Sequence, residues 1–450
     1  MKITDIKLIP VNKFLFVKVY TDEGITGIGE SGDWGFLEPA STGHHQEGSR
    51  QSGGRSMKIT DIKLIPVNKF LFVKVYTDEG ITGIGESGDW GFLESSGEVI
   101  KSFREYLIGQ DPLRIEHHWQ YMYRCFHFRG AAVMGALSAI DIALYDIAGK
   151  YYGVPVYQLL GGKVRDKVRV YSHVSGGSFE ELMESCLAEK EKGFTAIGHL
   201  SPFLDEPRST RYFETYARKM SNGVERLSRI REAVGLDVDL CIENHRRLNP
   251  AEAIALASQL EPLFPMFYED PLIPDNFDSM AWVAQKIRIP LATGERIHTP
   301  QEYQMLVKRQ ALDYLRVSIC VCGGFTGAKK IAAIAEANHL GIIPHNPLSP
   351  VATAACIQLD AAVPCFTIQE YPDPNGPAAH ARFVFEKTGK SEFHVCDIVD
   401  RMPECKDGFL IVPDAPGLGI ELLDGVEEKF PFERRKVVTR LTTDGAVMDQ

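Results

Sequence analysis

The sequence predicts an α/β protein: a (β/α)₈ TIM-type barrel with an α+β capping domain built from the N-terminal region and the C-terminal tail. Eight short apolar runs follow residue 167, and most of them are separated by amphipathic helical segments. Glu243, Glu269 and Glu295 close three successive runs at equal intervals, each about the length of one strand, one helix and two loops. The 450 residues leave room for a second domain, because a barrel takes about 250.

The composition is that of an ordinary soluble globular protein, with 44% hydrophobic and 24% charged residues. A net charge of −11 argues against nucleic acid as the main partner. Nine cysteines without disulfide or zinc spacing suit a reducing compartment. The N-terminus has no basic segment followed by an apolar one, and no apolar run reaches about 18 residues. We therefore expect a cytoplasmic protein with no membrane partner.

An exact internal repeat opens the chain. Residues 1–38 recur letter for letter at 57–94, and the Gly/Ser-rich residues 39–56 between them are typical of a flexible linker. Repeat architectures need about three diverged units, so two identical copies indicate a duplication instead. Only the second copy runs directly into helical segments. We expect that copy to pack, and residues 1–38 to lie outside the packed fold.

Residues 57–167 predict the capping domain. KITDIKLIPV and FLFVKVYTDEG alternate as a hairpin, and ITGIGES supplies a third strand. From Glu98 to about Gly161, apolar residues recur at three- and four-residue spacing, which predicts helices. A three-stranded meander followed by helices makes an α+β domain.

Residues 168–395 predict the barrel. Its eight strands are the runs VRVYSHV, FTAIGHL, DVDLCIE, FPMFYE, IPLATGE, LDYLRVS, LGIIPH and FTIQE. The second and third runs are far apart, and the charged stretch DEPRSTRYFETYARK between them predicts a loop plus helix beside the barrel mouth. Residues 396–450 predict one or two strands around a Pro/Gly turn that return to the cap.

Chemistry in such barrels lies at the C-terminal strand ends, where all eight strands meet. Those ends carry, in order, His173, His199, Glu243 with His245, Glu269, Glu295, Ser318, His345 and Glu370. Three carboxylates converging at one mouth supply the hard oxygen ligands that Mg²⁺ needs. His173 and His199 fit either a substrate contact or a satisfied polar core.

Several of these segments resemble a known group of enzymes. ENHRRLNP (243–250), YEDP (268–271), GER (294–296), CGGFT (322–326), PHNPLSPVA (344–352) and FTIQEY (366–371) are similar to motifs of the enolase superfamily. The resemblance favours its acid-sugar dehydratase branch, the galactonate and mannonate dehydratases of the mandelate racemase/muconate lactonizing enzyme family. It covers essentially all of residues 57–450.

The resemblance implies a role for each matching residue. Glu243, Glu269 and Glu295 match the Mg²⁺ ligands, and His245 matches the general acid for a departing hydroxyl. Two more matches follow: His345 as the base that removes the proton next to the carboxylate, and Glu370 as a hydrogen-bond partner of the enediolate. The implied reaction is Mg²⁺-dependent dehydration of an aldonate, such as galactonate, mannonate or gluconate, to a 2-keto-3-deoxy acid. The resemblance also implies a homo-oligomer whose partner is a small sugar acid.

This sequence departs from the family pattern at three strands. The first ligand is usually Asp, and here it is Glu243, one methylene longer. Ser318 stands where many relatives carry an Asp that orients the seventh-strand histidine, although mannonate dehydratases also lack that Asp. The second strand, Ile197–Leu200, lacks the lysines of racemases, which weighs against two-base racemisation. A racemase or epimerase of a carboxylate substrate stays open as an alternative, as does a catalytically depleted relative that binds sugar acids in a regulatory role.

Position alone suggests further substrate contacts. Asp89 and Trp90 follow the cap hairpin in a loop that could fold over the mouth and exclude water. Arg129, in FHFRG, is a candidate for a substrate hydroxyl or carboxylate. The remaining candidates for substrate binding are His199, Arg316 and Ser318.

Overall fold

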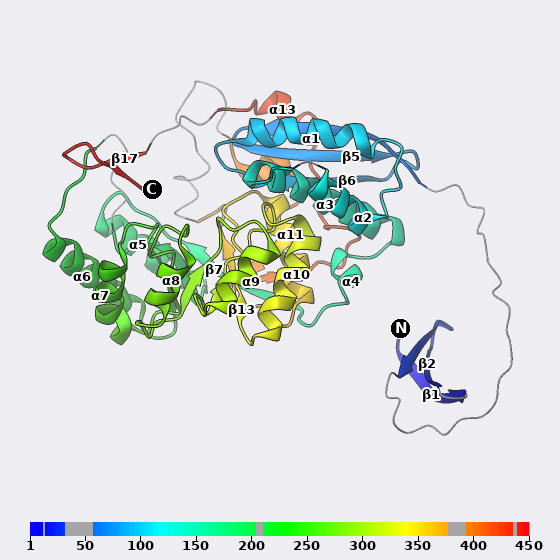
Figure 1. The fold of residues 1–450 in the computed structure, drawn as a ribbon, viewed down its shortest axis with the longest axis horizontal. Coiled ribbons are helices and arrows are strands. Elements are labelled where there is room, and N and C mark those ends of the chain that lie inside the picture. Colours follow the sequence, from blue (N-terminus) through cyan, green and yellow to red (C-terminus); the bar gives the residue numbers. More distant parts are fainter. Residues whose placement is uncertain are drawn as a thin grey trace. The chain divides into compact units, whose positions relative to one another are not determined.

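The computed structural model describes residues 1–11, 14–31, 57–125, 127–203, 210–376, 393–434 and 439–449. The chain divides into two units, Met1–Arg55 and Ser56–Gln450, and each is described by itself (Figure 1). The predicted linker 39–56 lies outside the described residues, as do residues 204–209 of the predicted insertion.

The first unit is a three-stranded antiparallel sheet. Its strands β1 (Ile3–Val11), β2 (Phe14–Thr21) and β3 (Thr26–Ser31) pair in that order. The apolar side chains of one face are open to solvent: Ile6 is 56% exposed and Ile28 is 71% exposed. The alternating sequence is therefore enough to form the sheet.

The second copy forms the same sheet, but with its apolar face covered. Strands β4 (Ile59–Val67), β5 (Phe70–Thr77) and β6 (Thr82–Ser87) repeat the register of the first unit. The covering helices are α1 (Leu93–Leu107), α2 (Ile115–Arg124) and α3 (Ala131–Tyr152). Here the counterparts of the two exposed residues, Ile62 and Ile84, are 4% and 0% exposed. The α+β cap is thus present as predicted.

Glycines let helix α3 lie directly on strand β6. A Cβ atom at Gly83 would fall 2.1 Å from the carbonyl oxygen of Ala143, and one at Gly85 would fall 2.0 Å from that of Ala139. Any side chain at these positions would push the helix off the sheet. Among the described residues, α3 is also the one helix whose length and composition would suit a membrane span, and 78% of its apolar window is buried inside the protein.

Eight parallel strands form the barrel, and each falls within one of the predicted runs. They are β7 (Lys167–His173), β8 (Ala196–Leu200), β9 (Asp239–Glu243), β10 (Phe267–Glu269), β11 (Leu291–Thr293), β12 (Tyr314–Leu315), β13 (Gly341–Ile342) and β14 (Gln369–Tyr371). Strands β7 to β13 pair in sequence order, and β14 pairs with β7. A parallel bridge from Ile342 to Phe366 joins the remaining edge. The prediction of a closed barrel is confirmed.

Helices alternate with these strands and surround the barrel (Figure 1). They are α5 (Phe179–Glu191), α6 (Tyr216–Val234), α7 (Pro250–Leu260), α8 (Phe277–Ala284), α9 (Pro300–Lys308), α10 (Gly324–Ala337) and α11 (Pro350–Ala362), and the short α4 (Val156–Leu159) precedes β7. Capping boxes at Asn249 and Thr299, each followed by proline, fix where α7 and α9 begin. Inside the barrel, side chains from several strands form a separate apolar cluster that includes Tyr171, Phe267 and Ile368.

The tail touches both the barrel and the cap. Strands β15 (Cys405–Lys406) and β16 (Phe409–Ile411) form a hairpin, and β16 extends the barrel sheet antiparallel to β7. Further on, helix α13 (Val426–Lys429) leads to Phe430, whose carbonyl accepts from the Asn68 amide of the cap. A last hairpin, β17 (Arg440–Leu441) and β18 (Val447–Met448), is described below.

Buried carboxylates of the cap fasten it to the barrel and the tail. Glu86 accepts from the Ser349 hydroxyl at 2.5 Å and from the Ala352 amide at 3.2 Å, at the start of α11. Asp141 accepts from the Thr326 amide at 3.1 Å in the first turn of α10. Burial raises the pKa of Glu86 to about 7, against the opposing effect of these hydrogen bonds. Each acid lies at a helix N-terminus, where the unpaired amides favour negative charge.

Deleting residues 1–56 is expected to leave the remaining protein folded, because α1–α3 cover the sheet formed by the second copy. The thermal unfolding midpoint and the Mg²⁺ affinity of the truncated protein should equal those of the full chain. Circular dichroism melts and calorimetric titrations would measure both. An insoluble truncated protein would show that residues 1–38 are part of the packed fold.

Candidate active site

The three glutamates at the barrel mouth converge on one point. Glu243 and Glu269 end the adjacent strands β9 and β10 and stand opposite each other in the parallel register. Glu295 follows β11 by two residues. Each residue offers a carboxylate oxygen within 4.8 Å of the other two. Equal spacing in the sequence has thus become proximity in space, because successive parallel strands end at the same edge.

Two buried arginines balance the negative charge of this cluster. The Arg316 guanidinium donates to Glu269 at 2.5 Å and to Glu370 at 2.5 Å. Arg246 donates to Glu295 at 2.6 Å and to Asp270 at 3.1 Å. Burial alone would raise the pKa of Glu295, but the nearby His345 and Arg246 bring it down to about 2. Glu295 is therefore ionised at neutral pH.

The donor set fits a small hard dication. Three carboxylates held this close repel one another, and Glu243 and Glu269 are only 5% and 1% exposed. Carboxylate oxygens are the ligands that Mg²⁺ prefers, with water or substrate oxygens completing the octahedron. A second possible group, His199, Glu243 and His245, shares Glu243 but mixes nitrogen with oxygen, which suits transition metals better.

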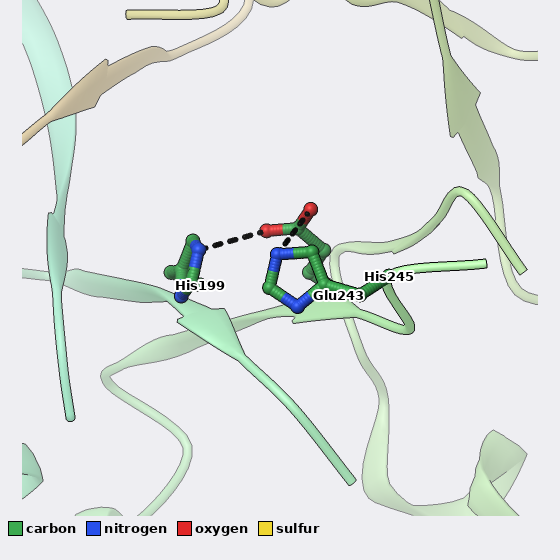
Figure 2. A group of neighbouring side chains, drawn as sticks. All are labelled: His199, Glu243 and His245. Atoms are coloured by element: carbon green, nitrogen blue, oxygen red, sulfur yellow. Dashed lines mark ion pairs between the residues drawn. The ribbon is translucent and has the colours of Figure 1, made fainter. Parts of the chain in front are cut away.

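Glu243 lies between two imidazoles (Figure 2). His245 Nε2 is 3.0 Å from one carboxylate oxygen of Glu243, and His199 Nε2 is 3.6 Å from the other. The two rings stand edge to face with centroids 4.5 Å apart. Burial lowers the pKa of His245, but the Glu243 carboxylate more than offsets this, so the net shift is upward. His245 is thereby suited to hold a proton near neutral pH.

His345 flanks the cluster at Glu295. Its Nε2 lies 3.3 Å from a carboxylate oxygen of Glu295. Within the described part of the chain, its Nδ1 is buried and has no hydrogen-bond partner. Ser318 is 1% exposed, and its carbonyl accepts from the amides of Val321 and Cys322. The anion that would orient His345 in many relatives therefore has no counterpart among these contacts.

Glu370 and Arg316 lie deeper than the sequence suggested. Glu370 is 2% exposed; one carboxylate oxygen accepts from His173 Nε2 at 2.6 Å, and the other from Arg316 and from the Asn346 amide at 2.9 Å. Arg316 is 1% exposed. The expectation that Arg316 binds substrate differs from this geometry, because its guanidinium is used up by carboxylates and carbonyls below the mouth. His173 is likewise a buried partner of Glu370.

The candidates on the cap make contacts of their own. Asp89 is 7% exposed and accepts from the Ser96 hydroxyl at 3.2 Å, and burial raises its pKa. The Trp90 ring lies under the Lys69 ammonium, with 5.0 Å from Nζ to the ring centroid. Arg129 is exposed and stacks over the Tyr123 ring at 4.2 Å. These contacts lie within the cap, so the structure does not bring the three residues to the glutamates.

The sequence did not single out Arg246 or Asp270, although both contribute charge at the mouth. Each directly follows a predicted site residue, His245 or Glu269, and that adjacency was the available signal. Both residues have positive φ, 62° for Arg246 and 37° for Asp270. His199 and His245 do as well, at 54° and 49°. Such backbone costs about 1–3 kcal/mol per residue and clusters at functional sites.

Family models match both parts of the larger unit. The mandelate racemase/muconate lactonizing enzyme N-terminal domain matches residues 59–161, and the enolase C-terminal domain-like model matches residues 185–426. With the barrel, the cap and the three glutamates, these matches define the class: the chain belongs to the enolase superfamily. Within that superfamily it is a hydro-lyase of the acid-sugar dehydratase branch.

Named relatives and solved structures agree with that assignment. The chain is 34% identical over 380 residues to a D-galactonate dehydratase of Ralstonia pickettii, covering 84% of this chain and 94% of the relative. It is 34% identical over 368 residues to that of Verminephrobacter eiseniae, covering 81% and 92%. A Pantoea ananatis enolase with bound D-gluconate and Mg superposes with TM-score 0.77 at 30% identity, covering 88% and 100%. An Agrobacterium radiobacter enolase with bound Na and L-malate gives 0.78 at 30%, covering 87% and 100%.

Proposed function

We propose that this protein dehydrates an aldonate, such as galactonate, gluconate or mannonate, to the 2-keto-3-deoxy acid with Mg²⁺ bound. The observation that carries the proposal is the placement of two imidazoles on different glutamates of one cluster: His245 at Glu243 and His345 at Glu295. Dehydration needs one group to accept a proton and another to donate one. The D-galactonate dehydratase relatives and the gluconate-bound neighbour support an aldonate as substrate.

Glu243, Glu269 and Glu295 would hold the Mg²⁺. When bound, the ion supplies positive charge that stabilises the substrate carboxylate as the neighbouring C–H bond is broken. His345 would take the C2 proton on Nε2. His245, kept protonated by Glu243, would give its proton to the 3-hydroxyl, which leaves as water. The resulting enol becomes the 2-keto acid by taking a proton at C3, so atoms and charge balance.

Glu370 and Arg316 would act below the substrate and not on it. The Arg316 guanidinium joins Glu370 to Glu269 and thereby fixes the orientation of one metal ligand. Glu370 in turn holds His173 and the Asn346 amide next to His345. We assign both residues a positioning role, in place of the enediolate contact expected for Glu370.

A panel of hexonates and pentonates incubated with Mg²⁺ tests the proposal. We expect 2-keto acid, detected as its semicarbazone, from one or a few hexonates, and none after the metal is removed with EDTA. His245→Ala should abolish the product, and His117→Ala, an exposed histidine of the cap, should not. If no acid in the panel gives product although Mg²⁺ binds, the dehydratase proposal is wrong. Deuterium exchange at C2 without keto acid would instead support an epimerase.

A further inference from the structure

A hairpin far along the chain reaches the barrel mouth. Strands β17 and β18 pair Arg440 with Met448 and Leu441 with Val447. The hairpin also bonds to the β8–α6 connection: the Tyr212 amide donates to Leu441, and the Thr443 amide donates to Tyr212. Three segments from distant parts of the sequence thus form one small ribbon. This ribbon fixes the position of the residue that follows β18.

That residue is Asp449, and it bonds to two arginines of the mouth. Its carboxylate faces the Arg296 guanidinium in a two-pronged pair, with oxygen–nitrogen distances of 3.0 and 3.4 Å. One of its oxygens also lies 3.8 Å from Nε of Arg246. The Asp449 and Arg246 side chains are only 17% and 7% exposed, so water screens this contact weakly.

The arginines connect Asp449 to the metal ligands. Arg246 uses Nη1 for Glu295 and Asp270, and turns its Nε edge toward Asp449. Arg296 follows Glu295 directly in the chain. Without a carboxylate on their outer side, both guanidinium groups would direct their charge at Glu295 and oppose a cation there. A planar guanidinium bound on two edges is also held in one orientation.

We propose that Asp449 is a positioning residue of the cation site. It anchors Arg246 and Arg296 from outside, keeps Arg246 in register with Glu295 and Asp270, and offsets the positive charge that the arginines add beside the bound ion. The hairpin is therefore a wall of the active site, contributed by a segment distant in the sequence from the strand ends. This inference rests on the proposed Mg²⁺ site.

The test is the Mg²⁺ dissociation constant of the full-length chain, measured by isothermal titration calorimetry. Asp449→Asn keeps the shape of the side chain and removes its charge, so Mg²⁺ affinity should fall by about three- to tenfold. Asp449→Glu restores the charge and should recover most of the affinity. Asp444→Asn is the matched control, because Asp444 lies in the turn of the same hairpin and bonds to Thr442 and the Ala446 amide.

The control should bind Mg²⁺ within about twofold of the unmodified protein. Unfolding midpoints of all three variants would verify that the fold is intact. The inference is overturned if Asp449→Asn binds Mg²⁺ as tightly as the unmodified protein, or if Asp444→Asn weakens binding equally. If the unmodified protein binds no Mg²⁺, the proposed function fails first. The two failures are therefore distinguishable.

Discussion

Replacing Arg316 with methionine is expected to lower the free energy of unfolding by about 3–5 kcal/mol. The guanidinium is 1% exposed and pairs with Glu269 and Glu370, which are 1% and 2% exposed. Methionine fills a similar volume but leaves both carboxylates buried without their cation. Urea unfolding followed by fluorescence would measure the loss. Because Glu269 also loses its orientation, Mg²⁺ affinity should fall with stability.

Arg309→Met is the matched control for that experiment. Arg309 pairs with Asp278 at 2.6 Å, but the two side chains are 36% and 81% exposed. Solvent-exposed pairs contribute about 0–1 kcal/mol, so this variant should unfold almost as the unmodified protein does. Equal stability losses in both variants would contradict the view that Arg316 balances a buried acid cluster.

Replacing His345 with glutamine is expected to lower kcat by about 10²–10⁴-fold, the range for loss of a general base. Glutamine can still donate a hydrogen bond to Glu295, and it cannot accept a proton. Exchange of the substrate C2 hydrogen with deuterated solvent should stop as well, because that exchange needs only the base. Mass spectrometry of the recovered aldonate would measure the exchange, and the keto-acid assay would measure kcat.

His245→Gln separates the two proposed roles. If His245 is the acid, this variant should lose keto-acid formation while C2 exchange continues. His117→Gln should change neither measurement, since His117 lies exposed on α2. Retention of C2 exchange in His345→Gln would contradict the assignment of the base and would direct attention to His199.

The fold and the glutamate cluster were predictable because local rules determine both. Each barrel strand is a short apolar run closed by a polar residue, and parallel strands present their C-terminal ends at one edge. Equal spacing along the chain therefore placed Glu243, Glu269 and Glu295 together before any coordinates were known. Capping residues such as Asn249 and Thr299 mark helix starts by the same kind of local signal.

Contacts between distant segments were not predictable in this way. Arg316 was expected at the substrate, but its burial depends on Glu269 and Glu370, which come from other strands. Asp449 gave no signal at all, because its partners lie far back in the chain. The duplicated segment gives the clearest case: Ile28 and Ile84 have identical neighbours in sequence, yet one is exposed and the other buried. Only the presence of a covering helix distinguishes them.

The left-handed backbone at His199, His245, Arg246 and Asp270 has a consequence for how this protein can change. Glycine would relax each position, so selection for stability alone would replace all four. Every such replacement would remove an imidazole or a charge from the mouth. Stability and catalysis therefore compete at these positions, and the thermostability gained there would be gained at the expense of turnover.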